Sequence, residues 1–401
     1  LVQAEDKHCD VMADILANKV LPHLKDILPL KCLEEFFTSA NLDVLYTSND
    51  YGYDYSDTSS LSNFAIINAF SKAIGSSYIV QNTTDCIPDD YTYEEYEQYQ
   101  FEMIKDKLLR NKNVIISGCS GVGKSYYANK MIADKFFVDH DKMFWHGSTE
   151  YADVIEGISA QVKNGAVEYS VLPGIVLQLA NRSVNGPKLM VIEGINKSNA
   201  AENFGELITL LEADKRHLKV EGADGKISIP EDMYFLCTLN PTVENQYKLD
   251  SAMKRRFVIV DLYPDYKLLQ LHLNVDEDDI ATDIDDFYQL NGKQLKCLAI
   301  SLLIKINDGI SRCIGASYRI GHAVFCDLPE NCTMANIIKI LDLMILPQIE
   351  EYCYDEDIAK SIFGDASPAI TVHPYGVEVH SFGSLTPEEV NTAIREILIN
   401  E

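Results

Sequence analysis

Three short apolar runs, each followed by a polar stretch, mark the middle of the chain. They cover residues 114–117, 188–193 and 233–239, and each has the length of a buried strand. Residues 94–109 carry apolar positions at three-to-four spacing, which predicts an amphipathic helix before the first run. Strands that alternate with helices are typical of βαβ units. We therefore predict a parallel sheet with right-handed crossovers between residues 94 and 260.

The pattern changes on both sides of this α/β region. Residues 1–48 and 61–74 have helical spacing, with a loop rich in Tyr, Asp and Ser between them. Residues 268–363 are again helical, and 369–372 have the pattern of a strand. The chain is thus predicted to carry helical regions before and after the sheet.

Two local signals add detail. A Gly-rich turn at 222–225 lies between two short apolar segments and predicts a β-hairpin. Near the end of the chain, Thr386 is followed by Pro387 and two glutamates. Threonine is a good N-cap and proline is favoured at the first helical position, so a closing helix is expected to begin there.

Composition and charge narrow the class of protein. Apolar residues make up 47% of the 401 residues, so the chain is globular and long enough for two or three domains. The net charge of −27 argues against a broad nucleic-acid-binding surface, because phosphate binding requires Lys and Arg. No apolar run reaches about eighteen residues and no secretory signal opens the chain, which favours a cytoplasmic protein that does not enter the membrane. Because the first residue is Leu1 rather than Met, a further N-terminal domain is left open.

Neither the cysteines nor the acidic clusters predict a metal site. None of the ten cysteines forms a C-x-x-C pair, so we interpret them as reduced cysteines of a cytosolic protein. The acidic runs at 276–279, 283–286 and 355–357 lack the spacing and the glycine of an EF-hand. We interpret these runs as solvated faces or docking surfaces.

The strand at 114–117 leads into the pattern of a phosphate-binding loop. Residues 118–125 match G-x-x-x-x-G-K-S, in which glycines turn backbone N–H groups onto phosphate oxygens and the next helix directs its positive end at them. In this pattern the lysine reaches the β- and γ-phosphates and the serine hydroxyl binds Mg²⁺. We therefore predict a site for a nucleotide and Mg²⁺ formed by Gly118, Cys119, Ser120, Gly121, Val122, Gly123, Lys124 and Ser125.

Polar residues after the later strands can complete this site. Glu193 ends the second apolar run and is predicted to hold Mg²⁺ together with Ser125. Asn240 follows the third run and is predicted to position the attacking water near the γ-phosphate. Arg255 and Arg256 lie at a helix end, where they can stabilise charge on a phosphate bound by a neighbouring subunit, as arginine fingers do.

With these motifs in place, residues from about 100 to about 365 resemble the AAA+ motor of McrB-type restriction proteins, within the broader group that includes MoxR-like ATPases. The most diagnostic segments are 203–208 and 212–216, which follow the acidic strand end in the family order. The other matching segments are 144–146, 151–158, 172–175, 192–197, 318–322 and 345–352.

The resemblance implies an α/β fold of the AAA+ P-loop NTPase class, with a parallel sheet core, a small helical lid and an N-terminal helical region. It also implies a ring, usually a hexamer, that hydrolyses ATP or GTP and controls an effector such as a nuclease in defence against foreign DNA. DNA would be contacted only indirectly or through a missing domain. Arg319 is implied as a lid contact to the nucleotide. The expected domains are 1–93 (N-terminal, mainly helical), 94–265 (nucleotide-binding), 266–366 (lid) and 367–401 (C-terminal segment).

Two departures from the family pattern leave alternatives open. Gly194 stands where the family carries the glutamate that orients the hydrolytic water, and glycine cannot act as a base, so slow hydrolysis is expected. Residues 241–245 differ from the family segment that bears on GTP preference, which leaves the choice between ATP and GTP open. The alternatives to an active motor are a hydrolysis-impaired scaffold and a MoxR-like chaperone that remodels a protein partner.

Overall fold

The computed structural model describes residues 92–163, 166–223, 225–242, 249–275, 286–353 and 355–400. The chain divides into two units, Leu1–Asp89 and Asp90–Glu401, and all described residues belong to the second. The helices predicted before residue 74, the divergent loop from residue 243 onward and the acidic runs between 276 and 285 lie outside the described residues.

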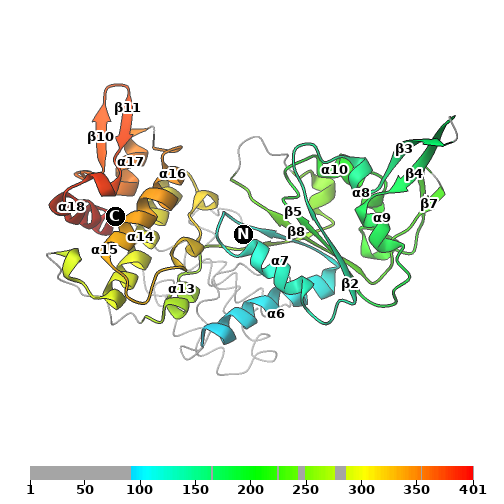
Figure 1. Ribbon diagram of the computed structural model, residues 1–401, viewed down its shortest axis with the longest axis horizontal. Coiled ribbons are helices and arrows are strands. Elements are labelled where there is room, and N and C mark those ends of the chain that lie inside the picture. The colour runs from blue at the N-terminus through cyan, green and yellow to red at the C-terminus, as the bar shows by residue number, and fades with distance from the viewer. Residues whose placement is uncertain are drawn as a thin grey trace, which may run out of the picture. The chain divides into compact units, whose positions relative to one another are not determined.

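A five-stranded sheet forms the core of the α/β region (Figure 1). Its strands lie in the order β2-β5-β8-β1-β9, and every neighbouring pair is parallel, which confirms the predicted fold class. The inner strands β1, β5 and β8 are near-continuous apolar runs because both of their faces are covered. The bounds are β1 Asn113–Ser117, β2 Asp139–Phe144, β5 Lys188–Glu193, β8 Met233–Leu239 and β9 Val258–Asp261.

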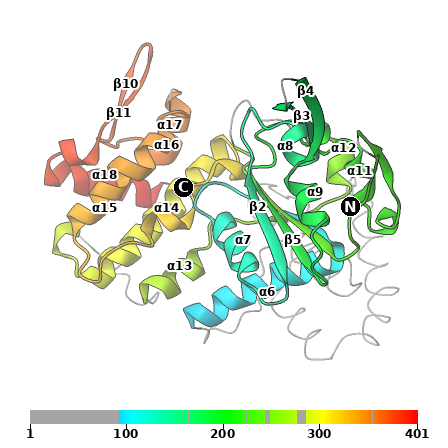
Figure 2. The ribbon, with the colours of Figure 1, turned by 45° about the vertical axis from the view of Figure 1, so that its right-hand side comes forward.

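Helices cover both faces of the sheet, because successive strand residues point to opposite sides. Val114 and Ile116 of β1 belong to a core shared with α6 (Tyr93–Asn111) and α7 (Lys124–Ile132), and Figure 2 shows both helices next to the sheet. Ile115 belongs to the core on the other face. The helices of that second core are α8 Tyr151–Val154, α9 Ile175–Ala180, α10 Ala200–Phe204, α11 Leu207–Leu210 and α12 Ser251–Lys254.

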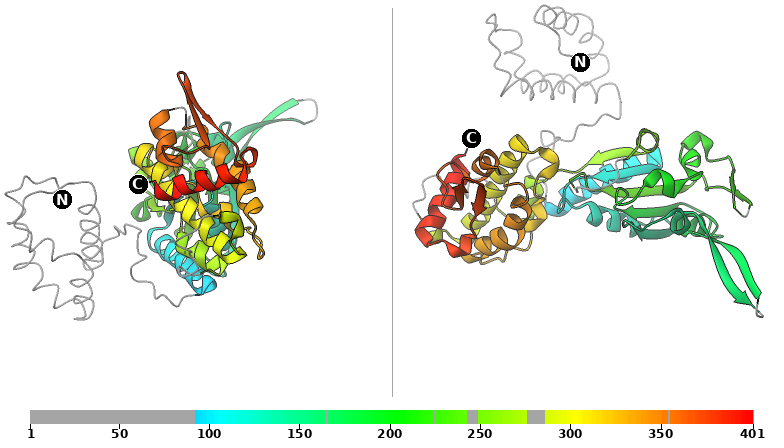
Figure 3. Two further views of the ribbon diagram at one scale, coloured as in Figure 1. Left: turned by 90° about the vertical axis from the view of Figure 1, so that its left-hand side faces the viewer. Right: turned by 90° about the horizontal axis from the view of Figure 1, so that it is seen from above.

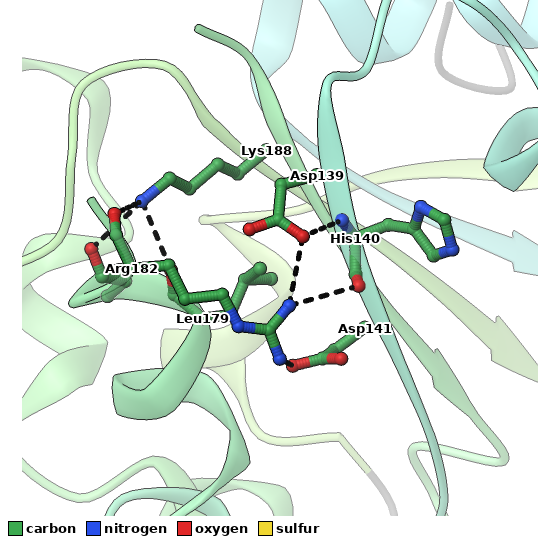
Figure 4. A network of polar contacts seen from close by, with 7 residues as sticks. Asp139, His140, Asp141, Leu179, Arg182 and Lys188 are labelled. Atoms are coloured by element: carbon green, nitrogen blue, oxygen red, sulfur yellow. Dashed lines mark hydrogen bonds and ion pairs between the residues drawn. The ribbon is translucent and has the colours of Figure 1, made fainter. Parts of the chain in front are cut away.

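A polar network joins the edge strand β2 to α9 and β5 (Figure 4). The Arg182 guanidinium pairs with Asp139 and Asp141 of β2 at 2.9 and 2.5 Å. The buried ammonium of Lys188 binds carbonyls at the end of α9 and just after it. It donates at 3.2, 3.2 and 2.7 Å to the carbonyl oxygens of Leu179, Ala180 and Arg182.

Two β-hairpins leave the α/β region. The hairpin predicted at 222–225 is present as β6 and β7. A longer hairpin, β3–β4, was not expected from the sequence, and Figure 3 shows it extending away from the sheet. Its apolar side chains alternate as in a strand, yet they face solvent: Ile158, Val162 and Tyr169 are 74%, 74% and 75% exposed. The bounds are β3 Glu156–Lys163, β4 Ala166–Pro173, β6 Val220–Gly222 and β7 Gly225–Ile227.

The helices that follow the sheet have a core of their own, built around the long helix α14 (Gly292–Cys313). This core runs from Leu269 to Ile397, so the closing helix packs with the lid helices. As predicted, Thr386 caps the closing helix, and Pro387 is its first residue. The other bounds are α13 Tyr266–Leu273, α15 Met334–Ile340, α16 Leu346–Ile349, α17 Glu356–Phe363, β10 Ile370–His373, β11 Gly376–Val379 and α18 Pro387–Ile399.

Two features are absent from the described residues. None of their helices combines the length and apolarity that a bilayer span requires. Among the same residues, no group of three or more His, Cys, Asp or Glu side chains is placed to hold a metal ion, and the cysteines are free thiols.

Candidate nucleotide-binding site

The phosphate-binding loop connects β1 to α7 at the carboxyl edge of the sheet, where parallel α/β proteins hold their ligands. Gly121 and Gly123 have φ angles of +78° and +88°, a left-handed conformation that favours glycine. Gly123 is the residue before the first turn of α7, so the loop ends where the helix presents its free N–H groups. This geometry is suited to an anion, and the sequence predicts a phosphate here.

The Lys124 side chain folds back onto the phosphate-binding loop that precedes it. Its ammonium donates to the carbonyl oxygens of Gly118 and Cys119 at 2.7 and 2.5 Å. Burial lowers the pKa of Lys124. Burial also raises the pKa of the Cys119 thiol to about 11, so this thiol is neutral near pH 7 and only its backbone is suited to phosphate.

The predicted metal ligands come together at the start of α7 and the end of β5. The Ser125 hydroxyl donates to Glu193 Oε2 at 2.6 Å, so two hard oxygen atoms meet beside the loop. Mg²⁺ prefers such oxygen ligands and keeps several waters, and these residues therefore fit it. The second oxygen, Glu193 Oε1, forms an ion pair with Lys142 Nζ of β2 at 2.5 Å. Lys142 was not singled out in the sequence, since a lysine on an edge strand gives no distinctive signal.

Gly194, the residue after Glu193, occupies the position of the usual catalytic base. Its backbone has a left-handed conformation. Gly194 has φ +74°, and its N–H donates to the carbonyl and hydroxyl oxygens of Thr238 at 3.1 and 3.0 Å. A Cβ placed at Gly194 would lie 2.9 Å from the Lys197 side chain. The Lys197 stem therefore occupies the space beside Gly194. The contacts of Gly194 with Thr238 are made by its main chain alone.

Asn240 lies at the end of β8, and β8 is the neighbour of both β1 and β5. Its amide oxygen accepts hydrogen bonds from the Thr242 N–H and hydroxyl at 3.1 and 2.7 Å. The Asn196 amide donates to the Asn240 carbonyl at 2.8 Å. With its oxygen engaged, the Asn240 side chain can offer its amide N–H groups to a phosphate or a water.

The two candidate arginine fingers lie in different surroundings. Arg256 is held within its own subunit, because it forms an ion pair with Glu212 and donates to the Ala252 carbonyl at 2.8 Å. Arg255 is exposed, and its Nε donates only weakly, at 3.3 Å, to the Ser251 carbonyl. Arg255 is therefore the one of the pair that can reach another subunit.

The lid touches the phosphate-binding loop through main-chain atoms. The Gly321 N–H donates to the Ser120 carbonyl at 3.1 Å, and the Ala323 N–H donates to the Gly121 carbonyl at 3.0 Å. A Cβ at Gly321 would lie 2.2 Å from the Ser120 oxygen, so only glycine permits this approach. The sequence did not predict this contact.

Two further lid side chains, His322 and Arg319, bind residues outside the loop. His322 is buried, burial lowers its pKa, and its Nδ1 accepts a hydrogen bond from the Asp265 N–H at 3.0 Å. It thus acts as a packed residue. Arg319 donates from Nε to the Ser311 hydroxyl at 2.6 Å and lies near enough to influence the pKa of the Cys119 thiol. Arg319, the residue implied as the lid contact to the nucleotide, therefore lies on the side of the lid that faces the phosphate-binding loop.

A cavity of 180 Å³ adjoins the phosphate-binding loop. α6, the loop end, α13 and the lid all contribute to its wall, including Tyr93 and His272, whose rings pack edge to face at 5.0 Å. The Tyr96 hydroxyl donates to the neighbouring Asp265 at 3.0 Å. The cavity thus offers aromatic surface and polar groups beside the loop, which are suited to a nucleotide base.

A phosphate-binding loop, a strand-end carboxylate and a strand-end asparagine on a parallel sheet with a helical lid define a nucleotide-binding protein of the AAA+ class. The AAA domain of the dynein-related subfamily matches residues 113–257, and the alpha-helical lid domain of McrB matches residues 298–359. The chain therefore belongs to the McrB-type AAA+ proteins, and the resemblance seen in the sequence is confirmed.

Known relatives carry restriction-enzyme names. The chain is 26% identical over 294 residues to the Type IV methyl-directed restriction enzyme EcoKMcrB subunit of Escherichia coli K12, a match that covers 68% of this chain and 60% of that protein. It is 25% identical over 202 residues to the Type II restriction enzyme BsuMI component YdiS of Bacillus subtilis 168, covering 38% of this chain and 58% of that one. The chain thus spans about 60% of the length of these relatives. A solved structure from Cytophaga hutchinsonii, described as a candidate ATPase, aligns at 14% identity over 75% of this chain and 89% of its own, with a TM-score of 0.31, and no argument rests on it.

The contact between lid and loop leads to a prediction for Gly321→Ala. The added methyl group would overlap the Ser120 carbonyl, and overpacking of this kind costs about 1–3 kcal/mol. We expect a lower urea midpoint together with weaker binding of a nucleotide analogue, measured by denaturation and calorimetry. Gly147→Ala is the matched control, because a Cβ there meets no atom within 4 Å. Equal urea midpoints for the two variants would show that the lid does not need this approach.

Proposed function

We propose that this chain is the nucleotide-binding subunit of a ring, most simply a hexamer, that controls a nuclease-type effector in defence against foreign DNA. The observation that carries the proposal is the phosphate-binding loop held against an McrB-type lid by the Gly321 and Ala323 N–H groups. The restriction-enzyme names of both relatives support the choice of effector. The net charge of −27 favours contact with a protein over direct contact with DNA.

Each predicted site residue has a role in this proposal. The loop N–H groups and Lys124 bind the phosphates, and Arg319 approaches the nucleotide from the lid. When bound, Mg²⁺ would be held by Ser125 and Glu193 and would neutralise charge between the β- and γ-phosphates. Asn240 positions a water at the γ-phosphate. Arg255 reaches the phosphate of the neighbouring subunit.

The first test is Lys124→Ala. Loss of the ammonium removes the charge-assisted contact to the phosphates, so affinity for ATP and GTP analogues should fall below detection. Binding is measured by calorimetry with each analogue, which also gives the base preference. Lys135→Ala, at an exposed position after α7, is the control and should bind like the parent. Parental affinity in the Lys124→Ala protein would contradict nucleotide binding at this loop.

The second prediction separates the two arginines. Arg255→Ala should impair nucleotide-dependent assembly and turnover without changing the urea midpoint. Arg256→Ala should lower the urea midpoint slightly, because it breaks the ion pair with Glu212. Mixing Arg255→Ala with Lys124→Ala subunits should partly restore turnover if Arg255 acts across an interface. The measurements are light scattering with and without nucleotide, phosphate release and urea denaturation. A monomer at saturating nucleotide would contradict the ring.

A hydrolysis-impaired scaffold is the second candidate function, and Gly194 is the observation that favours it. A base that orients water contributes about 10²–10⁴-fold in rate, and the main-chain contacts of Gly194 supply no such group. A ring built on this site would hold its nucleotide for long periods. A chaperone of the MoxR type remains a third candidate, which co-purification of a nuclease subunit would rule out.

The third prediction concerns Gly194. Restoring a carboxylate should raise turnover, but the left-handed backbone and the Lys197 stem oppose a side chain here. We therefore expect the gain in Gly194→Glu/Lys197→Ala, by about 10²-fold, the lower end of what a base supplies. Gly194→Ala/Lys197→Ala carries the same backbone strain without the carboxylate and should show no gain. Phosphate release is measured for all three proteins. Fast turnover of the parent, unchanged in the glutamate variant, would mean that another residue is the base.

A further inference from the structure

The cation of Lys142 is fixed at the metal end of the candidate site. Its Nζ lies 2.5 Å from Glu193 Oε1 and 2.7 Å from Asn129 Oδ1. Asn129 is one helical turn after Ser125 in α7, so the two anchors of the ammonium come from different elements. Phe144, two residues further along β2, packs its ring against the same ammonium at 4.7 Å from the ring centre. Three contacts therefore determine where this charge lies.

Both oxygens of the only predicted metal carboxylate are thus engaged. Glu193 Oε2 accepts from Ser125 and Oε1 pairs with Lys142. The side chains of Lys142 and Glu193 are only 21% and 14% exposed, so water screens this pair incompletely. Mg²⁺ would have to share the carboxylate with an ammonium, and the two cations would repel each other at a few ångströms.

The neighbouring residues make the net charge of the site more positive. The position after Glu193 is Gly194, so no second acid follows, and the stem of Lys197 lies beside it. Lys124 adds another cation within the phosphate-binding loop. A triphosphate entering this site meets two fixed ammonium groups and the positive end of α7 before any metal is considered.

We propose that Lys142 performs part of the charge-neutralising role of Mg²⁺, so that this site binds nucleoside triphosphate with little dependence on Mg²⁺. This inference rests on the proposed nucleotide-binding function and adds the Lys142 ammonium to the groups that bind the phosphates. The ammonium of Lys142 keeps its ion pair with Glu193 when the triphosphate enters, and its charge also acts on the β- and γ-phosphates. Lys142 is in this sense a binding residue for the phosphates, and the metal adds less than it does where the strand-end acid is free.

The test compares nucleotide affinity in excess Mg²⁺ and in EDTA, using non-hydrolysable ATP and GTP analogues and calorimetry. For the parent, we expect the two dissociation constants to differ by less than about tenfold, the size of one charge-assisted contact. In Lys142→Met, which keeps the apolar stem and loses the ammonium, the same ratio should rise by about tenfold or more. Lys142→Arg should restore the parental ratio.

A matched control comes from the same domain. Lys105 pairs with Asp134 at 2.7 Å, and its side chain is 19% exposed, close to the value for Lys142, but it lies outside the site. Lys105→Met should keep the parental ratio. A second readout is the affinity of Mn²⁺ for the protein–nucleotide complex, followed by electron paramagnetic resonance. It should increase in Lys142→Met, because Glu193 is then free to bind the metal.

The outcomes distinguish a failure of the nucleotide-binding function from a failure of the role given to Lys142. If the parent binds neither analogue under either condition, the nucleotide-binding function itself is wrong. If the parent binds only with Mg²⁺, or if Lys142→Met keeps the parental ratio and the parental Mn²⁺ affinity, nucleotide binding stands and the role of Lys142 is overturned. If Lys142→Met does not fold, as judged by circular dichroism, Lys142→Gln is measured in its place, with the same result expected.

Discussion

The backbone contact between the lid and the phosphate-binding loop is the constraint on which the rest of the site depends. Gly321 and Ala323 donate main-chain N–H groups to the carbonyls of Ser120 and Gly121, the same loop that must present its own N–H groups to phosphate. A loop whose outer carbonyls are satisfied by the lid can direct its inner face at a ligand at lower entropic cost. The position of the lid and the shape of the loop are therefore not independent. Any change in the loop on nucleotide binding acts on the lid through two hydrogen bonds and a close backbone contact.

How far the sequence predicts this structure depends on whether a feature is local. The strand, loop and helix around Lys124 follow one another in the chain, so their pattern is complete within residues 113–132. The same holds for the Thr386 cap, where the residues that cap and begin the helix are adjacent. The parallel sheet also followed from the alternation of apolar runs and helices. These features needed no knowledge of distant contacts.

The features that the sequence did not reveal depend on the tertiary structure. The β3–β4 hairpin was missed because its apolar residues, such as Tyr169, face solvent, whereas the reading of apolar patterns assumes that they mark a core. Arg255 and Arg256 are neighbours in the chain, and only the position of Glu212 shows that one of them is held internally. The contact of Gly321 with Ser120 joins residues two hundred positions apart in the chain, and no local pattern encodes it.

The absence of a second acid after Glu193 is more than the loss of one side chain. The Gly194 N–H is bound to Thr238 of the neighbouring strand in a left-handed conformation that L side chains rarely adopt, and the Lys197 stem fills the space beside it. The turn after β5 is thus built for glycine. In addition, the ammonium of Lys142 forms an ion pair with the carboxylate of Glu193. The backbone conformation and the charges both agree with the proposal of a site that retains a triphosphate and cleaves it slowly. A side chain at position 194 would meet the Lys197 stem in a strained backbone conformation, and the Glu193 carboxylate is paired with Lys142, so neither feature favours a catalytic base at this turn.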